Sequence, residues 1–213
     1  MNTNTLRYFE DYKNKNQIRK LHLGAGNISL DRWFNIDLYP DETRGIYFMD
    51  MTQPFVFEDK VFDFIYSEHN FEHFSLEDIY KILNECYRVL KPKGIIRIAT
   101  PDLKKIINFY NKKSDLHNEY NKWEVDCFIP FAREKGLYNK AIVLNNFFRC
   151  WGHQFIYDFE TMKTMLRLCG FKRIKKCKIY NSEYEDLVNI ESHGKNIGEA
   201  FNEIETMVIE AKR

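Results

Sequence analysis

The feature that most constrains the fold is a short apolar run ending in Gly24-Ala25-Gly26, followed by an acidic residue, Asp37. A run that ends in Gly-x-Gly is typical of a strand entering a tight turn, because glycine tolerates unusual backbone angles and lets the main chain approach a ligand. A second apolar run ends in Asp37, whose carboxylate can accept hydrogen bonds from ribose hydroxyls. The pattern predicts a nucleotide-like cofactor at the ends of two strands.

Apolar runs and helical periodicities alternate along the rest of the chain. The expected helices span 5–16, 75–90, 102–110 and 158–169, and the expected strands 18–23, 33–38, 45–49, 61–67, 95–99, 171–180 and 206–211. Only residues 27–32 separate the first two strands, which is too few for the crossover helix that a parallel pair normally needs. The sequence therefore predicts one α/β domain over 1–213, doubly wound, with a shortened first crossover.

Composition excludes several classes of protein. With 32 basic and 31 acidic side chains, the formal net charge is +1, which gives no general attraction to nucleic acid. The five cysteines show no C-x-x-C spacing, and no apolar stretch approaches membrane-spanning length. We expect a cytoplasmic protein with a small-molecule acceptor, no nucleic-acid partner and no membrane insertion; whether it forms a homodimer stays open.

Seven segments carry a family resemblance when taken together: 21–26, 35–38, 50–51, 62–74, 85–94, 97–103 and 151–158. They resemble class I S-adenosylmethionine-dependent methyltransferases, and more narrowly a small bacterial branch associated with surface polysaccharide and glycan pathways. The most specific segment is Glu-x-x-Arg-Val-Leu-Lys-Pro-x-Gly at 85–94. The chain departs from the pattern at Ile28, where a third glycine is usual, and at Ala25, where cysteine is common.

The resemblance implies a Rossmann-like, mostly parallel seven-stranded sheet with an antiparallel last strand. It also implies S-adenosylmethionine as cofactor and S-adenosylhomocysteine as product. In this arrangement Asp37 binds the ribose, Asp50 accepts from the adenine amine, and Ser67 and Glu68 lie along the methionine part. The implied cofactor-binding residues are Gly24, Ala25, Gly26, Asp37, Leu38, Asp50, Met51, Ser67 and Glu68.

For the acceptor, we expect O-methylation of a sugar, a nucleotide-sugar or a phosphorylated (phosphate or phosphoramidate) precursor in surface glycan or capsule biosynthesis. A hydroxyl must lose its proton, and an imidazole with a pKa of about 6.5 suits that task, so the predicted general base is either His69 or His153. An anionic acceptor would need no base. Segment 111–157 is the expected acceptor lid, and the predicted acceptor-binding residues are Asp102, Arg149, Gln154 and Tyr157.

Residues 69–73 also spell H-x-x-E-H, a pattern known from a group of zinc proteases. The segment follows directly on a buried strand, and no downstream helix offers an obvious third ligand, so we expect no metal site. His73 and His22 are interpreted as structural, and His193 receives no role. The basic residues between 172 and 178 are interpreted as a solvated strand edge.

Three alternatives remain open from the sequence. An NAD-binding Rossmann oxidoreductase would require glycine where Ser29 stands and a full crossover helix. A nucleic-acid or protein methyltransferase would carry a different sequence directly after the strand at 61–67, or a basic surface. A non-catalytic partner protein that keeps the methyltransferase fold would not need the glycines and acids.

Overall fold

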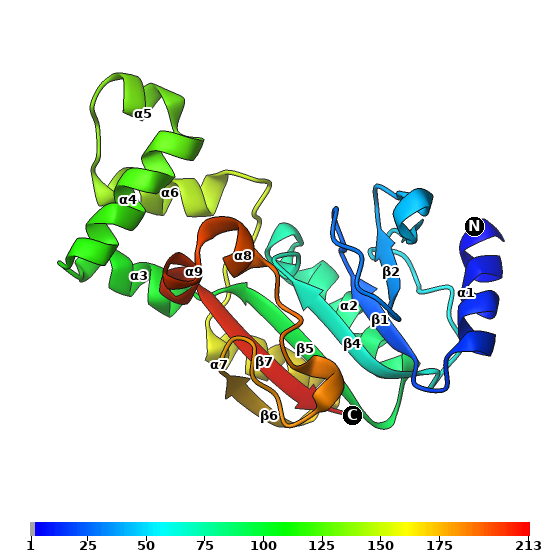
Figure 1. Cartoon of the computed structure of the whole chain (residues 1–213). Helices are drawn as coiled ribbons and strands as arrows, with labels where there is room; N and C mark the ends of the chain where they lie inside the picture. Colours follow the sequence, from blue (N-terminus) through cyan, green and yellow to red (C-terminus); the bar gives the residue numbers. More distant parts are fainter. Residues whose placement is uncertain (1–2) are drawn as a thin grey trace.

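The computed structural model describes residues 3–213 and contains one seven-stranded sheet (Figure 1). The strands lie in the order β3-β2-β1-β4-β5-β7-β6, and β7 alone runs antiparallel to its neighbours. Their bounds are β1 Lys20–Leu23, β2 Phe34–Asp37, β3 Ile46–Phe48, β4 Phe62–Glu68, β5 Leu90–Pro101, β6 Lys172–Cys177 and β7 Thr206–Lys212. This order confirms the predicted Rossmann-like α/β fold class.

The first crossover is short, as predicted. Residues 24–33 connect β1 to β2 through turns and bends without a helix, and the 3-10 turn η1 (Glu42–Arg44) precedes β3. Despite the short connection, β1 and β2 pair in parallel, with Leu23 beside Ile36. The Gly24–Gly26 turn and Asp37 therefore lie at the same edge of the sheet, where the parallel strands end.

One face of the sheet is covered by helices that share a single apolar core. They are α1 (Thr3–Lys15), α2 (Leu76–Val89) and α7 (Phe159–Leu168), which contribute Phe9, Ile82 and Leu166 to that core. The N-termini of α2 and α7 are capped by side chains: the Ser75 hydroxyl accepts from the Asp78 N–H, and the Asp158 carboxylate accepts from the Thr161 N–H.

The opposite face is covered by segment 178–192, which contains only the 3-10 turn η3 (Glu185–Leu187). Leu187 packs there against Trp33, Tyr66 and Ile95. The sequence assigned no structure to residues 181–205. This segment covers the sheet and ends in two short helices, α8 (His193–Ile197) and α9 (Glu199–Glu205), before β7.

Segment 111–149, which the sequence left unassigned, is helical. It contains α4 (Asp115–Phe128), α5 (Pro130–Glu134) and α6 (Lys140–Arg149), which share a second apolar cluster with α3 (Leu103–Asn111). Figure 1 shows these helices at one end of the molecule, beside α8 and α9. They lie beyond the edge where the parallel strands end, where they can close over a ligand.

Two strand predictions are corrected. β5 begins at Leu90 rather than Ile95, because the chain passes from α2 directly into the sheet, with a register irregularity between Phe62 and Phe64. β6 ends at Cys177 rather than Tyr180. β6 is the edge strand and carries the predicted basic residues. Among residues 3–213, no helix is long and apolar enough to cross a membrane.

Candidate active site

Two adjoining hollows lie where the parallel strands end. The first, of about 170 Å³, is lined by segments 22–28, 68–69 and 192–196 and is called here the cofactor cleft. The second, of about 330 Å³, is lined by residues from segments 69–73, 101–153 and 193–205 and is called here the acceptor cavity. His69 and His193 line both hollows, so these two side chains form the wall that the cleft and the cavity share.

The Gly24–Gly26 turn requires glycine at both ends. Gly24 and Gly26 have φ of 67° and 55°, in the left-handed region. A Cβ on Gly24 would lie 2.2 Å from Cγ of Asn70, whereas a Cβ on Gly26 would meet nothing within 4 Å. Gly24 is therefore fixed by packing under Asn70, while the space over Gly26 is open for a ligand.

The Asp37 carboxylate closes this turn. Its Oδ2 accepts from the Gly26 N–H at 2.8 Å and its Oδ1 accepts from the Tyr39 N–H at 2.9 Å. Each carboxylate oxygen has a second lone pair, so Asp37 can still accept from a diol. An open glycine turn beside such an acceptor fits the ribose of a nucleoside.

The other predicted cofactor residues lie at the same edge, in different surroundings. Leu38 is exposed and Met51 buried, while the Asp50 carboxylate accepts from the backbone and side chain of Thr52. Ser67 is buried, and its hydroxyl donates to the Leu23 carbonyl. Their roles toward the cofactor stay predictions.

Replacing Asp37 with alanine should weaken S-adenosylmethionine binding by about 10–100-fold, because a hydrogen bond to a charged group contributes about 1.5–3 kcal/mol. Calorimetric titration measures the change. Asp31→Ala is the matched control, since the Asp31 side chain is 96% exposed and lies in the turn before β2. Equal affinities in a folded Asp37→Ala variant and wild type would remove Asp37 from the ribose site.

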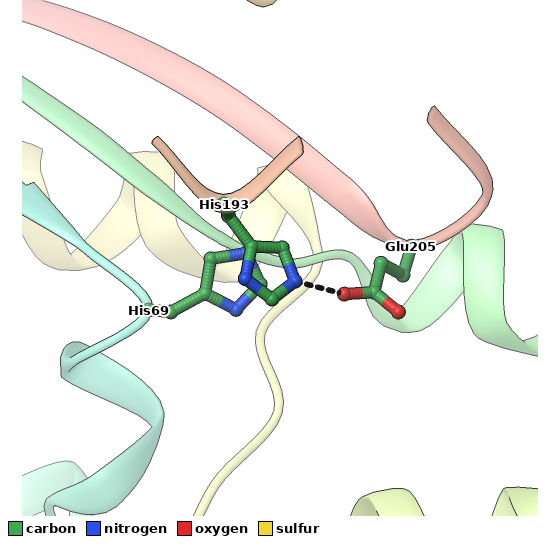
Figure 2. Close-up of side chains that lie close together, drawn as sticks. All are labelled: His69, His193 and Glu205. Atoms are coloured by element: carbon green, nitrogen blue, oxygen red, sulfur yellow. Dashed lines mark hydrogen bonds and ion pairs between the residues drawn. The ribbon is translucent and has the colours of Figure 1, made fainter. Parts of the chain in front are cut away.

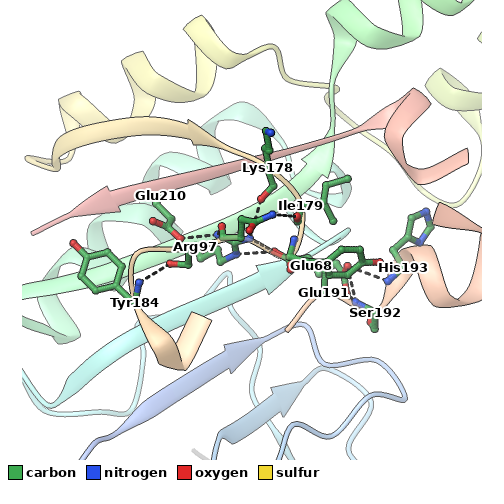
Figure 3. A network of polar contacts seen from close by, with 12 residues as sticks. Glu68, Arg97, Lys178, Ile179, Tyr184, Glu191, Ser192, His193 and Glu210 are labelled. Atoms are coloured by element: carbon green, nitrogen blue, oxygen red, sulfur yellow. Dashed lines mark hydrogen bonds and ion pairs between the residues drawn. The ribbon is translucent and has the colours of Figure 1, made fainter. Parts of the chain in front are cut away.

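Glu68, predicted to bind the cofactor, fixes the segment that carries His193. Its carboxylate accepts from the N–H groups of Ser192 and His193 at 2.9–3.0 Å and from the Ser192 hydroxyl at 2.6 Å. Figure 3 shows these contacts between the end of β4 and the start of α8. Glu68 still lines the cofactor cleft, but the structure gives its oxygens a positioning role.

The preceding residue, Glu191, is held by a buried arginine. Arg97 on β5 is fully buried and donates to Glu191 and Glu210, each at 2.6 Å, and to the carbonyl of Asn181 at 3.0 Å (Figure 3). Arg97 and Glu210 are direct partners across β5 and β7. This network ties segment 178–192 to the sheet and so fixes the backbone that carries His193.

His193 and Glu205 form a pair that sequence reasoning missed. His193 Nε2 lies 2.6 Å from Glu205 Oε1, and the His193 ring stacks on His69 with ring centroids 3.7 Å apart (Figure 2). His69 Nε2 lies 2.8 Å from the Thr206 hydroxyl, and His69 Nδ1 lies 3.5 Å from Glu72. Both ring nitrogens of His69 therefore have protein partners, whereas His193 Nδ1 has none among the contacts of the described residues.

Behind the His193–Glu205 pair, Tyr120 connects Glu205 to a second buried carboxyl group, Glu124. The Tyr120 hydroxyl contacts both Glu205 and Glu124, the latter at 3.1 Å, but has one hydrogen to donate. Burial, and then the charge of Glu205, raise the pKa of Glu124 to about 8. Glu124 therefore favours the protonated form near neutral pH, which leaves the single Tyr120 hydrogen for Glu205. Glu205 remains the acceptor for both Tyr120 and His193.

Replacing Glu124 with glutamine should make stability less sensitive to pH. Because the folded-state pKa is raised from 4.5 to about 8, the contribution of Glu124 is fully present below pH 4.5 and is lost as pH rises to about 8. The Glu124→Gln variant should gain on wild type over that window, by on the order of a few kcal/mol. Urea unfolding at several pH values measures this gain. A constant difference, as expected for exposed Glu119→Gln, would contradict it.

The acceptor cavity has aromatic walls and a polar floor. Trp123, Phe128, Phe147 and Trp151 come from segment 111–157, and Glu72, His73 and His153 line the floor. No lysine or arginine is among the residues that line it. Sequence reasoning did not identify several cavity residues, among them Trp123 and Glu124. The one signal for them in the sequence is the density of aromatic residues between 111 and 151.

The titrations of the histidines follow from their burial and contacts. Burial lowers the pKa of His22 to about 4 and also lowers the pKa of His153, so both rings favour the neutral form. Burial opposes the charge on His69 as well, but contact with Glu72 raises its pKa above the usual value. His22 is buried and bonded to Asn35, as its structural interpretation requires.

The four predicted acceptor-binding residues do not line the acceptor cavity. Asp102 is buried, caps α3 and pairs with Lys176, and Tyr157 is buried in the main core. Arg149 is exposed at the end of α6. Gln154 is exposed, and its amide donates to the His73 carbonyl at 2.8 Å. The carboxylate of Asp102 is used to cap α3. His153, which lies in the same sequence motif as Gln154, does line the cavity.

Comparisons with known proteins agree with this geometry. Residues 37–98 match a family model described as a methyltransferase domain, and no curated protein matches the chain. The fold is similar to an S-adenosylmethionine-dependent methyltransferase from Mesorhizobium loti, which is 13% identical with a TM-score of 0.53 over 92% of this chain and 91% of that one. It is also similar to the YcgJ protein from Bacillus subtilis, at 13% identity, TM-score 0.50 and 98% coverage of each chain.

A third similar structure is phosphoethanolamine N-methyltransferase 2 from Haemonchus contortus, solved with phosphomonomethylethanolamine and S-adenosylhomocysteine. It is 12% identical with a TM-score of 0.50, over 99% of this chain and 52% of that one. At these identities the likeness speaks for the fold. Residues 37–98 thus match a methyltransferase domain, and the fold of the chain is similar to that of S-adenosylmethionine-dependent methyltransferases.

Proposed function

We propose that this methyltransferase methylates a hydroxyl group of a small polar acceptor held in the acceptor cavity. One observation carries the proposal: His69 and His193 line both the cofactor cleft and the cavity, so donor and acceptor would meet beside these rings. S-adenosylmethionine supplies a methyl group already activated by its sulfonium. The protein then mainly has to align the acceptor oxygen with that methyl and remove the proton.

We propose His193 as the general base. Glu205 accepts from His193 Nε2, so the hydrogen lies on Nε2 and the lone pair on Nδ1, in the way that a buried carboxylate orients a catalytic imidazole. His69 has both ring nitrogens in contact with Thr206 and Glu72, which favours a positioning role. The predictions for His69 and His153 as bases stay untested beside this one.

We propose a neutral sugar or a similar polyol as the acceptor. Aromatic walls suit the apolar faces of a sugar ring, and the polar floor offers partners for its hydroxyls. The lack of lysine and arginine among the lining residues favours a neutral acceptor over the phosphorylated precursor that the sequence left open. The link to surface glycan or capsule biosynthesis rests on the sequence resemblance alone.

A second candidate acceptor is an amine. Three acidic side chains, Glu72, Glu124 and Glu205, line the acceptor cavity together with two tryptophans. Carboxylates and aromatic faces together favour a cation. A protonated amine would first have to lose its proton, which His193 could also accept.

We also propose that the chain is one methyltransferase domain in which segment 111–157 is the acceptor lid, since that segment supplies the aromatic walls. A cytoplasmic location and a small-molecule acceptor without nucleic acid suit the five unpaired cysteines and the near-neutral net charge.

The test begins with calorimetric titration of S-adenosylmethionine and S-adenosylhomocysteine, followed by a screen for methyl transfer to three acceptor sets: neutral sugars and polyols, sugar phosphates, and small amines. We expect micromolar binding of the cofactor and transfer to the first set. Transfer only to amines would replace O-methylation by N-methylation, and transfer only to sugar phosphates would contradict the argument from the lack of lysine and arginine in the lining. Cofactor binding without transfer to any set would oppose the proposed acceptor class.

A further inference from the structure

The floor of the acceptor cavity holds a cluster of three side chains to which the proposed proton removal by His193 assigns no step. Glu72, His73 and His153 each offer one metal-ligating atom, and these atoms lie within 4.8 Å of one another. Glu72 and His73 come from the 3-10 turn η2 (Phe71–His73), which follows β4, and His153 comes from the loop after α6. The His73 and His153 rings are 5.0 Å apart and inclined at 69°, so their in-plane lone pairs can converge.

One oxygen of the Glu72 carboxylate makes no hydrogen bond and has only an ion-pair contact with His69. Glu72 is fully buried, and its Oε2 accepts from the Thr100 hydroxyl at 3.1 Å. Its Oε1 has no hydrogen-bond partner, and His69 Nδ1 lies 3.5 Å away. A buried carboxylate oxygen without a hydrogen bond is incompletely compensated by one ion-pair contact at 3.5 Å, and a bound cation would add a direct favourable contact.

His153 is oriented as a ligand. Its Nδ1 lies 2.7 Å from the Phe147 carbonyl oxygen, which can only accept, so Nδ1 carries the hydrogen and the lone pair lies on Nε2. Metal-ligating histidines almost always donate their other ring N–H to a carbonyl, a carboxylate or water in this way. The Phe147 carbonyl thus prepares Nε2 for an ion.

The two segments that carry the cluster are fixed to each other. The Glu72 carbonyl accepts from the N–H groups of Gln154 and Phe155, at 2.7 and 3.2 Å, and the Gln154 amide donates to the His73 carbonyl. These bonds join the turn after β4 to the loop after α6. They give the exposed Gln154 a positioning role and hold the three side chains on rigid supports.

The neighbouring group of His69, His193 and Glu205 is less suited to an ion. The two rings stack at 3.7 Å with an inclination of 27°, so their in-plane lone pairs run side by side instead of converging (Figure 2). His193 Nε2 is also bonded to Glu205. The stacked pair is better arranged for proton transfer.

We propose that Glu72, His73 and His153 bind one first-row divalent cation, with open coordination positions toward the acceptor cavity. Two imidazoles and one carboxylate are ligands that zinc and the neighbouring transition metals accept. The H-x-x-E-H pattern contributes only Glu72 and His73, and the third ligand comes from a loop eighty positions later. If the proposed function holds, the ion would bind the acceptor oxygen and lower its pKa, so that His193 could remove the proton.

The test measures metal binding by the full chain without cofactor or acceptor, so its outcome does not depend on methyl transfer. After dialysis against EDTA, the protein is titrated with Zn²⁺ in competition with a chromophoric chelator. We expect one equivalent, with a Kd at or below about 1 µM. Glu72→Gln and His153→Gln should each weaken binding by about 100-fold or more, since loss of an outer-shell partner alone costs about 10–100-fold.

The matched controls are His193→Gln, from the neighbouring group, and His117→Gln, from α4. Both should bind Zn²⁺ like wild type, and zinc X-ray absorption should show two imidazoles in the first shell. Circular dichroism of the metal-free proteins establishes that each variant is folded. Three results would overturn the site: no stoichiometric binding by folded wild type, binding that persists in both Gln variants of the ligands, or loss in His193→Gln with retention in His153→Gln.

Discussion

Replacing His193 with alanine should lower kcat by about 10²–10⁴-fold, the usual contribution of a positioned base. The affinity for S-adenosylmethionine should change much less, because the main chain of residues 192 and 193 stays bonded to Glu68. The measurement is kcat at saturating acceptor, with the substrate found in the screen, beside the calorimetric Kd for the cofactor. Glu205→Gln keeps the shape of the pair without the charge and should cause a smaller loss of kcat.

Two comparisons separate a base from a structural residue. Added imidazole should restore part of the activity of His193→Ala, since the vacated volume adjoins both the cleft and the cavity. The same addition should not rescue Glu205→Gln, which retains its imidazole. Near wild-type kcat in His193→Ala, with a large loss in His69→Ala, would return the role of base to His69.

Replacing Arg97 with methionine should destabilise the protein by about 3–5 kcal/mol, because it leaves buried Glu191 without its cation and Glu210 with only Lys175, at 3.5 Å. Glu191 is fully buried and Glu210 is 1% exposed, so neither can regain water without opening the sheet face. Urea unfolding at neutral pH measures the loss. Since Glu191 adjoins Ser192 and His193, we also expect lower cofactor affinity in any Arg97→Met protein that folds.

Arg167→Met is the matched control, since Arg167 is exposed near the end of α7. It should change stability by less than about 0.5 kcal/mol. A similarly small effect of Arg97→Met would mean that the buried ion pairs contribute little more than their desolvation costs.

Much of the fold could be predicted from local signals in the sequence. The cap at Ser75, the apolar run of β4 and the missing crossover after Gly26 each depend on a few neighbouring residues, and each is found in the structure. Segment 181–205 gave no such signal. Its course is set by Arg97 and Glu68, whose partners lie about 90–125 positions away and leave no periodicity in the chain.

The candidate site also contains residues that a local sequence pattern predicts and residues that it does not. The glycine turn and Asp37 follow from a strand–turn pattern, and the structure brings them together through one hydrogen bond. Asp102 and Tyr157 do not line the acceptor cavity, because one caps α3 and the other packs in the main core, and neither role can be told from an acceptor role in the sequence. Glu205 could not be found in advance, because its partners Tyr120 and His193 come from separate elements.

The position of β7 constrains the order in which the enzyme can be assembled during synthesis. β7 lies between β5 and β6, yet it is translated after both, and Glu205 and Thr206 enter the site at its start. When the glycine turn and His193 have emerged from the ribosome, β7 has not yet been made, so the edge strand β6 is not yet joined to the rest of the sheet. Such long-range pairing slows folding. Under the proposed function, the site should therefore be complete only when the last strand inserts and brings Glu205 and Thr206 into place.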